Sequence, residues 1–208
     1  MKKKIIIFGG TFDPIHNGHL IVAQYAAKHI GAMWVVFVPA RRSPHKRLCP
    51  MASGDDRLAM IRLAIAGRGN FVVSDCELLR AEPSYTIDTL RCLRHDYGDD
   101  AEFYLLAGAD GLKDMPQWHM IEELLDECNV CLMARPGYEM PDIHEYACVF
   151  GDERIEKLGR NILKNPLVDI SGTQIRQKLR DGEDVSGFVP EKVLDYILSH
   201  RLYRCAEK

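Results

Sequence analysis

Residues 5–20 read IIIFGGTFDPIHNGHL, and this stretch decides the fold. It begins with Ile5–Phe8, a short apolar run rich in β-branched residues, which predicts a strand buried on both faces. The pair Gly9-Gly10 follows at once, where the backbone can turn sharply and can lie close to a ligand. From His19 onward the apolar residues recur with helical spacing. The stretch therefore predicts a strand, a Gly-rich turn and a helix.

Two histidines lie where this helix is expected to begin. His16 and His19 are three residues apart, so in a first helical turn both side chains project from the same face. A helix N-terminus presents free backbone N–H groups and a partial positive charge, which suit a phosphate. Two imidazoles beside that phosphate can donate hydrogen bonds to its oxygens, where charge gathers during nucleotidyl transfer. The pair therefore predicts a catalytic phosphate site.

The histidine pair also allows two other interpretations. Half of a zinc site is one, but Zn²⁺ needs three or four ligands and nothing adjacent in the sequence supplies the others. Histidines that only cap a helix are the other. The surrounding Gly-Gly and Pro residues favour a phosphate-binding turn over both.

The ten residues Gly10–His19 resemble the signature of the nucleotidylyltransferase superfamily, which carries a His-x-Gly-His or Thr-x-Gly-His segment. The resemblance implies that His16 and His19 are catalytic, that they contact the phosphates of ATP, and that no covalent enzyme intermediate forms. It also implies that main-chain groups of four turn residues line the ATP site: Gly9, Gly10, Thr11 and Phe12.

Residues 39–50 form a basic segment without periodicity. They include three prolines, four Lys or Arg residues and no acidic residue, which predicts a loop. The loop follows the end of a predicted parallel strand, the edge where ligands bind in open α/β sheets, and this favours a lid over a polyphosphate rather than a solvated surface loop. Ser43–Lys46 resembles a Pro-x-x-Lys-type segment of the superfamily, and the resemblance makes Lys46 a contact of both nucleotides.

Residues 85–90 read YTIDTL and open another helix, with Ser84 as its predicted N-cap. This segment closely resembles one that is specific to nicotinate-nucleotide adenylyltransferases. The resemblance implies that Tyr85 and Thr86 line the pocket for the pyridine carboxylate and that Trp118 stacks on the pyridine ring. It adds three more residues to the nicotinate nucleotide site: Thr11, Lys46 and Arg135. On the residues alone, an ordinary capped helix and a Trp that serves packing stay open.

Gly108 and Asp110 come directly after another buried strand. A Gly and an acid in this position can serve a ribose hydroxyl or a turn. The superfamily carries a similar segment near the nucleotide, so the resemblance implies that both residues contact ATP.

Residues 170–176 read ISGTQIR, and Ser171 followed by Gln174 is a capping-box pattern that predicts a helix start. Hydroxyls, free N–H groups and Arg176 one turn into the helix would together bind phosphate, whereas a capped helix with a solvated Arg is the alternative. A similar segment in the superfamily implies ATP contacts from Ile170, Ser171, Thr173 and Arg176. Gly172 stands where Ser is usual, so one hydroxyl is missing, and activity is expected to survive.

The composition is that of one globular α/β domain over residues 1–208, with 47% hydrophobic and 27% charged residues. The net charge of -3 argues against a general nucleic-acid binder, and no apolar run is long enough to span a bilayer. Seven cysteines form no disulfide framework, which suits a reducing compartment and predicts a cytoplasmic protein. Cys128 and Cys131 are predicted to be plain thiols, because a redox Cys-x-x-Cys usually precedes a helix and a zinc site needs a second pair.

Strands and helices alternate to about residue 135, which predicts an α/β fold with a doubly wound parallel sheet in three α/β/α layers. The resemblance implies the same Rossmann-like fold. Further strands are expected at residues 34–38, 70–75, 102–107, 129–134, 146–150 and 167–170. Helices are expected at residues 55–66 and 152–163 and, packed on the sheet, within about 171–203. Because both phosphate-binding turns follow strands, they are expected to meet at the carboxyl edge of the sheet.

The resemblance implies adenylyl transfer from ATP to nicotinate mononucleotide, which gives nicotinate adenine dinucleotide and pyrophosphate in NAD biosynthesis. Mg²⁺ is expected to arrive with ATP, because it often keeps its waters and binds through phosphates, and no protein metal site is expected. The expected partners are these two substrates, without nucleic acid or membrane, and a homo-oligomer stays open. One alternative is a phosphopantetheine adenylyltransferase-like enzyme, which usually lacks the segments around Tyr85 and Trp118. Another is a non-catalytic nucleotide-binding regulator, against which intact His16, His19 and Arg176 argue.

Overall fold

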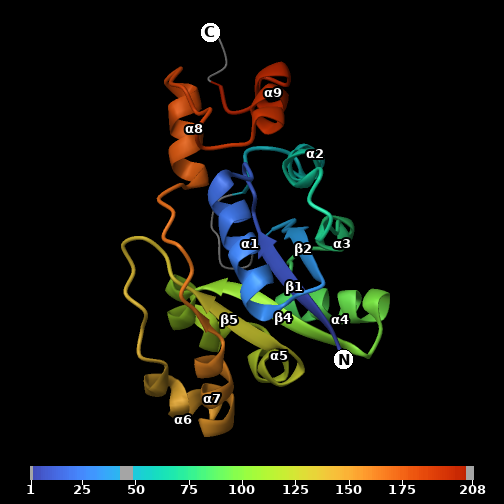
Figure 1. Cartoon of the computed structure of the whole chain (residues 1–208), viewed down its shortest axis with the longest axis vertical. Helices are drawn as coiled ribbons and strands as arrows, with labels where there is room; N and C mark the ends of the chain where they lie inside the picture. Colours follow the sequence, from blue (N-terminus) through green and yellow to red (C-terminus); the bar gives the residue numbers. More distant parts are fainter. Residues whose placement is uncertain (1, 43–48, 205–208) are drawn as a thin grey trace.

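The computed structural model describes residues 2–42 and 49–204 of the chain. Its centre is a six-stranded parallel sheet in the order β3-β2-β1-β4-β5-β6 (Figure 1). This confirms the predicted doubly wound sheet. The strands are β1 (Lys3–Gly10), β2 (Trp34–Pro39), β3 (Phe71–Val73), β4 (Ala101–Gly108), β5 (Asn129–Met133) and β6 (Ile162–Leu163).

Helices connect the strands and cover both faces of the sheet. The α-helices are α1 (Asn17–Ile30), α2 (Gly54–Ile65), α3 (Cys76–Leu79), α4 (Thr86–Tyr97), α5 (Ile121–Glu127), α6 (Ala147–Phe150), α7 (Asp152–Arg160), α8 (Gly172–Arg180) and α9 (Glu191–Ser199). Two 3-10 helices, η1 (Ala109–Gln117) and η2 (Ile143–Tyr146), complete the described elements.

Neighbouring residues of the central strand face opposite layers, as a strand with a two-residue period requires. Ile6 and Phe8 belong to a buried apolar cluster that includes residues of α1, α2, α8 and α9. Ile5 and Ile7 belong to a second cluster with residues of α4, α5 and α7. The three-layer arrangement is therefore confirmed, and Figure 1 shows α2, α8 and α9 together at the top of the molecule.

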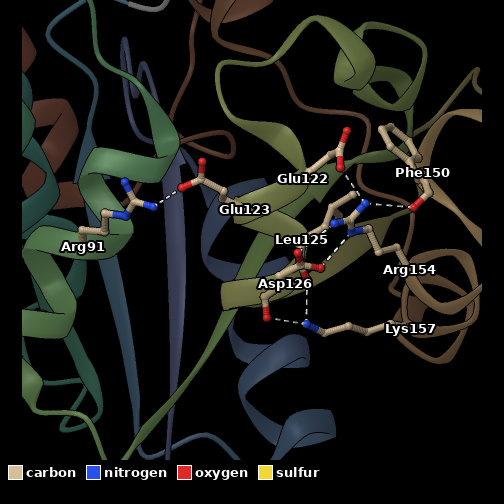
Figure 2. Close-up of polar contacts among 8 residues, drawn as sticks. All are labelled: Arg91, Glu122, Glu123, Leu125, Asp126, Phe150, Arg154 and Lys157. Carbon is tan, nitrogen blue, oxygen red and sulfur yellow. Dashed lines mark hydrogen bonds and ion pairs between the residues drawn. The ribbon is translucent and has the colours of Figure 1, made fainter.

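Helix α5 is held between two neighbouring helices by charged side chains (Figure 2). Arg91 of α4 pairs with Glu123 of α5, and Arg154 of α7 makes two hydrogen bonds of 2.8 Å to the carboxylate of Asp126. The ammonium of Lys157 donates to main-chain carbonyls at the end of α5, at 2.6 and 3.2 Å. Those carbonyls have no partner within the helix, so the lysine satisfies them. The pairs lie at the surface, where solvent screens them and each contributes little to stability.

The strand predicted for residues 146–150 is wrong, because these residues lie in η2 and α6. The carboxylate of Asp142 accepts the N–H of His144 at 2.9 Å, which begins η2 with a local cap. Ile143 and Phe150 are both buried in the second apolar cluster. A helical path that buries these two side chains replaces the expected strand.

The strand predicted for residues 167–170 is also wrong. Within the described residues the last strand is β6, which lies earlier and also shortens the helix predicted for residues 152–163. The side chain of Asn165 accepts the N–H of Ala134 at 2.9 Å and donates to its carbonyl at 3.1 Å, so a side chain continues the pairing beyond β5. Pro166 has no N–H to extend the ladder.

Cys128 and Cys131 are buried, and burial raises the pKa of both thiols to about 12. They stay protonated at neutral pH, which confirms that they are plain core thiols rather than a redox pair. Within residues 2–42 and 49–204, the helices are all too short or too polar to cross a membrane. That residues 1–208 form a single domain stays a prediction.

Candidate active site

A cavity of about 730 Å³ opens at the carboxyl edge of the sheet, beyond the ends of β1 and β5. Strands β1 and β4 are adjacent there and the strand order reverses between them, which is the place where open α/β sheets bind ligands. The segment that leads into α8 forms another wall, so the two phosphate-binding turns do meet. The predicted site residues that line this cavity are Gly9, Gly10, Thr11, Phe12, His16, His19, Arg135, Ile170, Ser171, Thr173 and Arg176.

The two histidines stand together at the start of α1. The helix begins at Asn17, two residues earlier than predicted, and extended backbone at His16 makes that residue the N-cap. The two rings stack with centroids 3.6 Å apart. The Nδ1 atom of His19 accepts the backbone N–H of His16 at 3.3 Å. In the neutral His19 ring, the proton therefore lies on Nε2, which makes that atom a hydrogen-bond donor.

His16 is more deeply buried than His19, with only 6% of its surface exposed. Burial, with a smaller effect from the nearby positive charge of Arg135, lowers the pKa of His16 to about 4. The ring is thus neutral at pH 7. Gly18 makes room for it, because a Cβ at that position would lie 3.1 Å from the His16 Nδ1 atom. The His16 ring therefore favours a glycine at position 18, directly before His19.

We expect His16 to make stability depend on pH between about 4 and 6.5. Its ring takes up a proton near pH 6.5 when unfolded but only near pH 4 when folded, so the unfolded chain binds more protons in this window. The contribution is therefore lost as the pH falls, by about 2 kcal/mol between pH 7 and pH 5. Urea unfolding at pH 7 and pH 5 measures the free energy of unfolding. Between these pH values the natural chain should lose about 2 kcal/mol more than His16→Asn does. Equal pH dependence of the two proteins would contradict this expectation.

Helix α8 begins as the capping pattern predicted. Ser171 is the N-cap, and its hydroxyl accepts the N–H of Gln174 at 3.2 Å. The guanidinium of Arg176 donates to the main-chain carbonyl of Asp13 at 2.6 Å and to the hydroxyl of Thr173 at 3.3 Å. Arg176 is therefore not a solvated surface residue, because it joins α8 to the turn that precedes the histidines.

Gly172 has a steric role that the sequence did not predict. A Cβ at this position would lie 3.0 Å from the carbonyl oxygen of Asp13 and 3.2 Å from Arg176 Nη1. The absence of a side chain lets the start of α8 approach the turn closely. The missing hydroxyl is thus accompanied by a tighter contact between the two phosphate-binding turns.

Asp13 is a buried residue of the site that sequence reasoning missed. Its carboxylate accepts hydrogen bonds from the N–H groups of Met51 and Ala52, at 2.8 and 3.1 Å, and from the hydroxyl of Tyr203 at 2.7 Å. Arg57 is buried nearby and donates to the carbonyls of the turn and of the strand end beside it, both at 2.8 Å. The one feature of the sequence that could have indicated this role is the position of Asp13, a carboxylate between Phe12 and Pro14 inside the turn. Its partners lie 38 to 190 residues away.

The residues predicted to hold the nicotinate nucleotide do not all join this cavity. Tyr85, Thr86 and Trp118 are absent from its described lining. Tyr85 instead stacks on His119, with ring centroids 4.2 Å apart, which brings the YTIDTL segment beside the residue that follows Trp118. Lys46 lies outside the described residues.

Ser84 is not the N-cap of α4, which was the prediction. The N-cap is Tyr85, and no side chain caps the helix there. The Ser84 hydroxyl is instead used between segments, since it accepts the backbone N–H groups of Arg41 and Arg42 at 3.2 and 3.4 Å. It therefore joins the beginning of the basic segment to the start of α4.

Gly108 and Asp110, both predicted to contact ATP, are absent from the described lining of the cavity. The carboxylate of Asp110 pairs with Arg135, which does line the cavity, at 3.2 Å. Both side chains fold over Gly108, where a Cβ would lie 2.2 Å from the Asp110 carboxylate and 2.9 Å from Arg135 Nε. A larger residue at this position would have to displace the Asp110–Arg135 pair.

The described part of the chain contains no group of three or more His, Cys, Asp or Glu side chains arranged to hold a metal ion. Asp13 is the buried carboxylate nearest the histidines in sequence, and three donors already occupy it.

Comparison with known proteins places these features in context. The model of the cytidylyltransferase-like family matches residues 7–178. The chain is 42% identical to a probable nicotinate-nucleotide adenylyltransferase of Pectobacterium atrosepticum, with 95% of this chain and 97% of the relative aligned. It is 41% identical to one of Pseudomonas fluorescens, with 98% and 99% aligned.

A solved structure also resembles this fold. The nicotinic acid mononucleotide adenylyltransferase of Plasmodium falciparum, solved as a complex with NaAD, superposes with a TM-score of 0.75. The alignment covers 97% of each chain at 21% identity, which supports the shared fold.

Proposed function

The chain belongs to the cytidylyltransferase-like family, and we propose that it transfers the adenylyl group of ATP to nicotinate mononucleotide. The products are nicotinate adenine dinucleotide and pyrophosphate. Near-full-length identity of about 40% to probable nicotinate-nucleotide adenylyltransferases supports this reaction. The observation that carries the proposal is the stacked His16–His19 pair at the start of α1, on the wall of the cavity.

The reaction is an in-line displacement at phosphorus. A phosphate oxygen of nicotinate mononucleotide attacks the α-phosphorus of ATP, and the bond to the leaving pyrophosphate breaks. His19 donates from Nε2 to a phosphate oxygen, since its Nδ1 accepts the backbone N–H of His16. His16 stays neutral at pH 7 and therefore acts as a hydrogen-bonding group without a charge of its own. Positioning and preorganised donors supply most of the catalysis in such a transfer.

The second phosphate-binding turn supports the leaving group. Arg176 is already held by Asp13 and Thr173, so its charge is oriented before ATP arrives. The N–H groups at the start of α8 add the positive end of a helix dipole. Together with Lys46, Arg176 offsets the charge that develops on pyrophosphate. The other ATP contacts in the proposal are Gly9, Gly10, Thr11, Phe12, Gly108, Asp110, Ile170, Ser171 and Thr173.

The acceptor binds between the cavity and the YTIDTL segment. Backbone N–H groups at the start of α4, beside Tyr85 and Thr86, meet the pyridine carboxylate, and Trp118 stacks on the ring. Arg135 lines the cavity and is paired with Asp110. Thr11 and Lys46 complete the acceptor site. The neutral amide of nicotinamide mononucleotide lacks the charge that these groups attract.

Mg²⁺ enters with ATP as part of the substrate. Mg²⁺ keeps several waters and binds through phosphates and one or two carboxylates. The carboxylate of Asp13 is occupied by three donors, so the phosphates hold the ion. A cytoplasmic location accompanies this proposal, since seven cysteines without a disulfide framework suit a reducing compartment.

Pyrophosphate release is the direct test of this function. The protein is incubated with ATP, Mg²⁺ and one of three acceptors: nicotinate mononucleotide, nicotinamide mononucleotide or phosphopantetheine. We expect release with nicotinate mononucleotide, and a much lower kcat/KM with its amide. Comparable kcat/KM values for nicotinate mononucleotide and nicotinamide mononucleotide would contradict the proposed pocket for the carboxylate. Release with phosphopantetheine alone would keep the mechanism and replace the acceptor, whereas ATP binding without release would indicate a nucleotide-binding regulator.

A further inference from the structure

Three distant segments of the chain converge on Asp13, two of them on its carboxylate and one on its backbone carbonyl. Its Oδ2 atom accepts the N–H of Met51, and its Oδ1 atom accepts both the N–H of Ala52 and the hydroxyl of Tyr203. Its backbone carbonyl accepts the guanidinium of Arg176. Asp13 is 7% exposed, so these contacts form away from bulk water, where hydrogen bonds to a charged group are strong.

Tyr203 reaches this carboxylate by an unusual backbone path. After α9 the chain turns through Arg201 at φ 52° and enters Tyr203 at φ 65°, both in the left-handed region that L-residues with bulky side chains avoid. Tyr203 is nevertheless 5% exposed, and burial beside Asp13 raises the pKa of its phenol. The backbone accepts a strained conformation that delivers the hydroxyl to Asp13.

The position of Asp13 matters for both walls of the nucleotide cavity. Asp13 lies three residues before His16, and its carbonyl orients Arg176. On its other side, it fixes the N–H groups of residues 51 and 52, directly after Cys49 and Pro50, which line the cavity. A rotation of the carboxylate would therefore displace several groups that face the nucleotide.

We propose that Tyr203 is a positioning residue for the nucleotide site, which it orders by fixing the carboxylate of Asp13 between the histidine turn and residues 49–52. This inference rests on the proposed function only in taking MgATP as the ligand of the cavity. Tyr203 touches no reacting atom, and it acts through Asp13. Loss of its hydroxyl leaves Oδ1 with the N–H of Ala52 alone, so the carboxylate and the segment that it holds are less ordered before ATP binds.

The test compares two Tyr→Phe variants of the full chain. Tyr203→Phe removes the hydroxyl that reaches Asp13. Tyr196→Phe is the matched control, because its hydroxyl also donates to a carboxylate, that of Asp56 at 3.0 Å, and joins α9 to α2. Calorimetric titration with MgATP gives the Kd without any need for turnover. Urea unfolding first establishes that each variant is folded at the temperature of the titration.

We expect Tyr203→Phe to raise the Kd for MgATP by about 3- to 10-fold, since only part of the energy of one hydrogen bond to a charged group reaches the ligand. Tyr196→Phe should leave the Kd unchanged. In steady-state turnover, the KM for ATP should rise while the KM for nicotinate mononucleotide does not. A purely structural role would lower the stability of Tyr203→Phe and leave the Kd as it is, and this result would overturn the proposal.

Asp13→Asn keeps the test decisive if Tyr203→Phe does not fold. It changes the acceptor pattern at the same atoms while keeping the shape of the side chain, and we expect a similar rise in the Kd for MgATP. An unchanged Kd in this variant would equally overturn the proposal. Failure of the proposed function looks different, since the natural chain would then release no pyrophosphate with nicotinate mononucleotide while the Kd comparison between variants still holds.

Discussion

Replacing His19 by Ala is expected to lower kcat by about 10²-fold or more, the scale of losing one preorganised donor. The ring stands at the first turn of α1 on the cavity wall. Its Nδ1 atom accepts the backbone N–H of His16, which leaves Nε2 as the donating atom. The effect should fall on kcat more than on the KM for ATP, because the charge that Nε2 stabilises grows in the transition state. Steady-state pyrophosphate release measures both.

His29→Ala is the matched control for this prediction. His29 lies in the last turn of the same helix, where it is exposed and stacks on Tyr25, and it does not line the cavity. Its removal should leave kcat unchanged. Circular dichroism and unfolding in urea establish that both variants keep the fold. A folded His19→Ala protein with near-normal turnover would exclude His19 from the mechanism.

Replacing Asp13 by Ala is expected to lower the free energy of unfolding by about 3–5 kcal/mol, the cost of removing one partner from a buried charged network. The substitution leaves the N–H groups of Met51 and Ala52 and the hydroxyl of Tyr203 without their acceptor. It also leaves the buried guanidinium of Arg57 without the negative charge beside it, whose attraction opposes the lowering of the Arg57 pKa by burial. Urea unfolding at pH 7 measures the change.

Asp181→Ala provides the comparison for this stability effect. Asp181 is exposed, and within the described part of the chain its carboxylate accepts only the side-chain amide of Gln177. Removing such a surface group should change the free energy of unfolding by less than about 1 kcal/mol. If Asp13→Ala lowered the free energy of unfolding as little as Asp181→Ala does, the contacts of Asp13 would not stabilise the turn.

Local patterns were sufficient for the strands that carry the site. The β-branched run Ile5–Phe8 and the similar run in β2 are apolar throughout, and such runs predict buried parallel strands without knowledge of their neighbours. The N-cap at Ser171 depends on residues three apart and was confirmed, since its hydroxyl accepts the N–H of Gln174. The prediction failed at residues 146–150 and 167–170, where helical capping and the side chain of Asn165 replace strand pairing.

The sequence by itself determined the first five strands, and it placed the histidine pair at a helix N-terminus, because these features depend on residues within a few positions of one another. Only the tertiary structure decided which side chains support the turn. Asp13 meets Met51 and Tyr203 across 38 and 190 residues, and Gly172 is tight against the Asp13 carbonyl. The charge of Arg135, which adds to the effect of burial in lowering the pKa of His16, also comes from a distant segment. Contacts between such segments depend on how the layers pack, and no local spacing in the sequence encodes them.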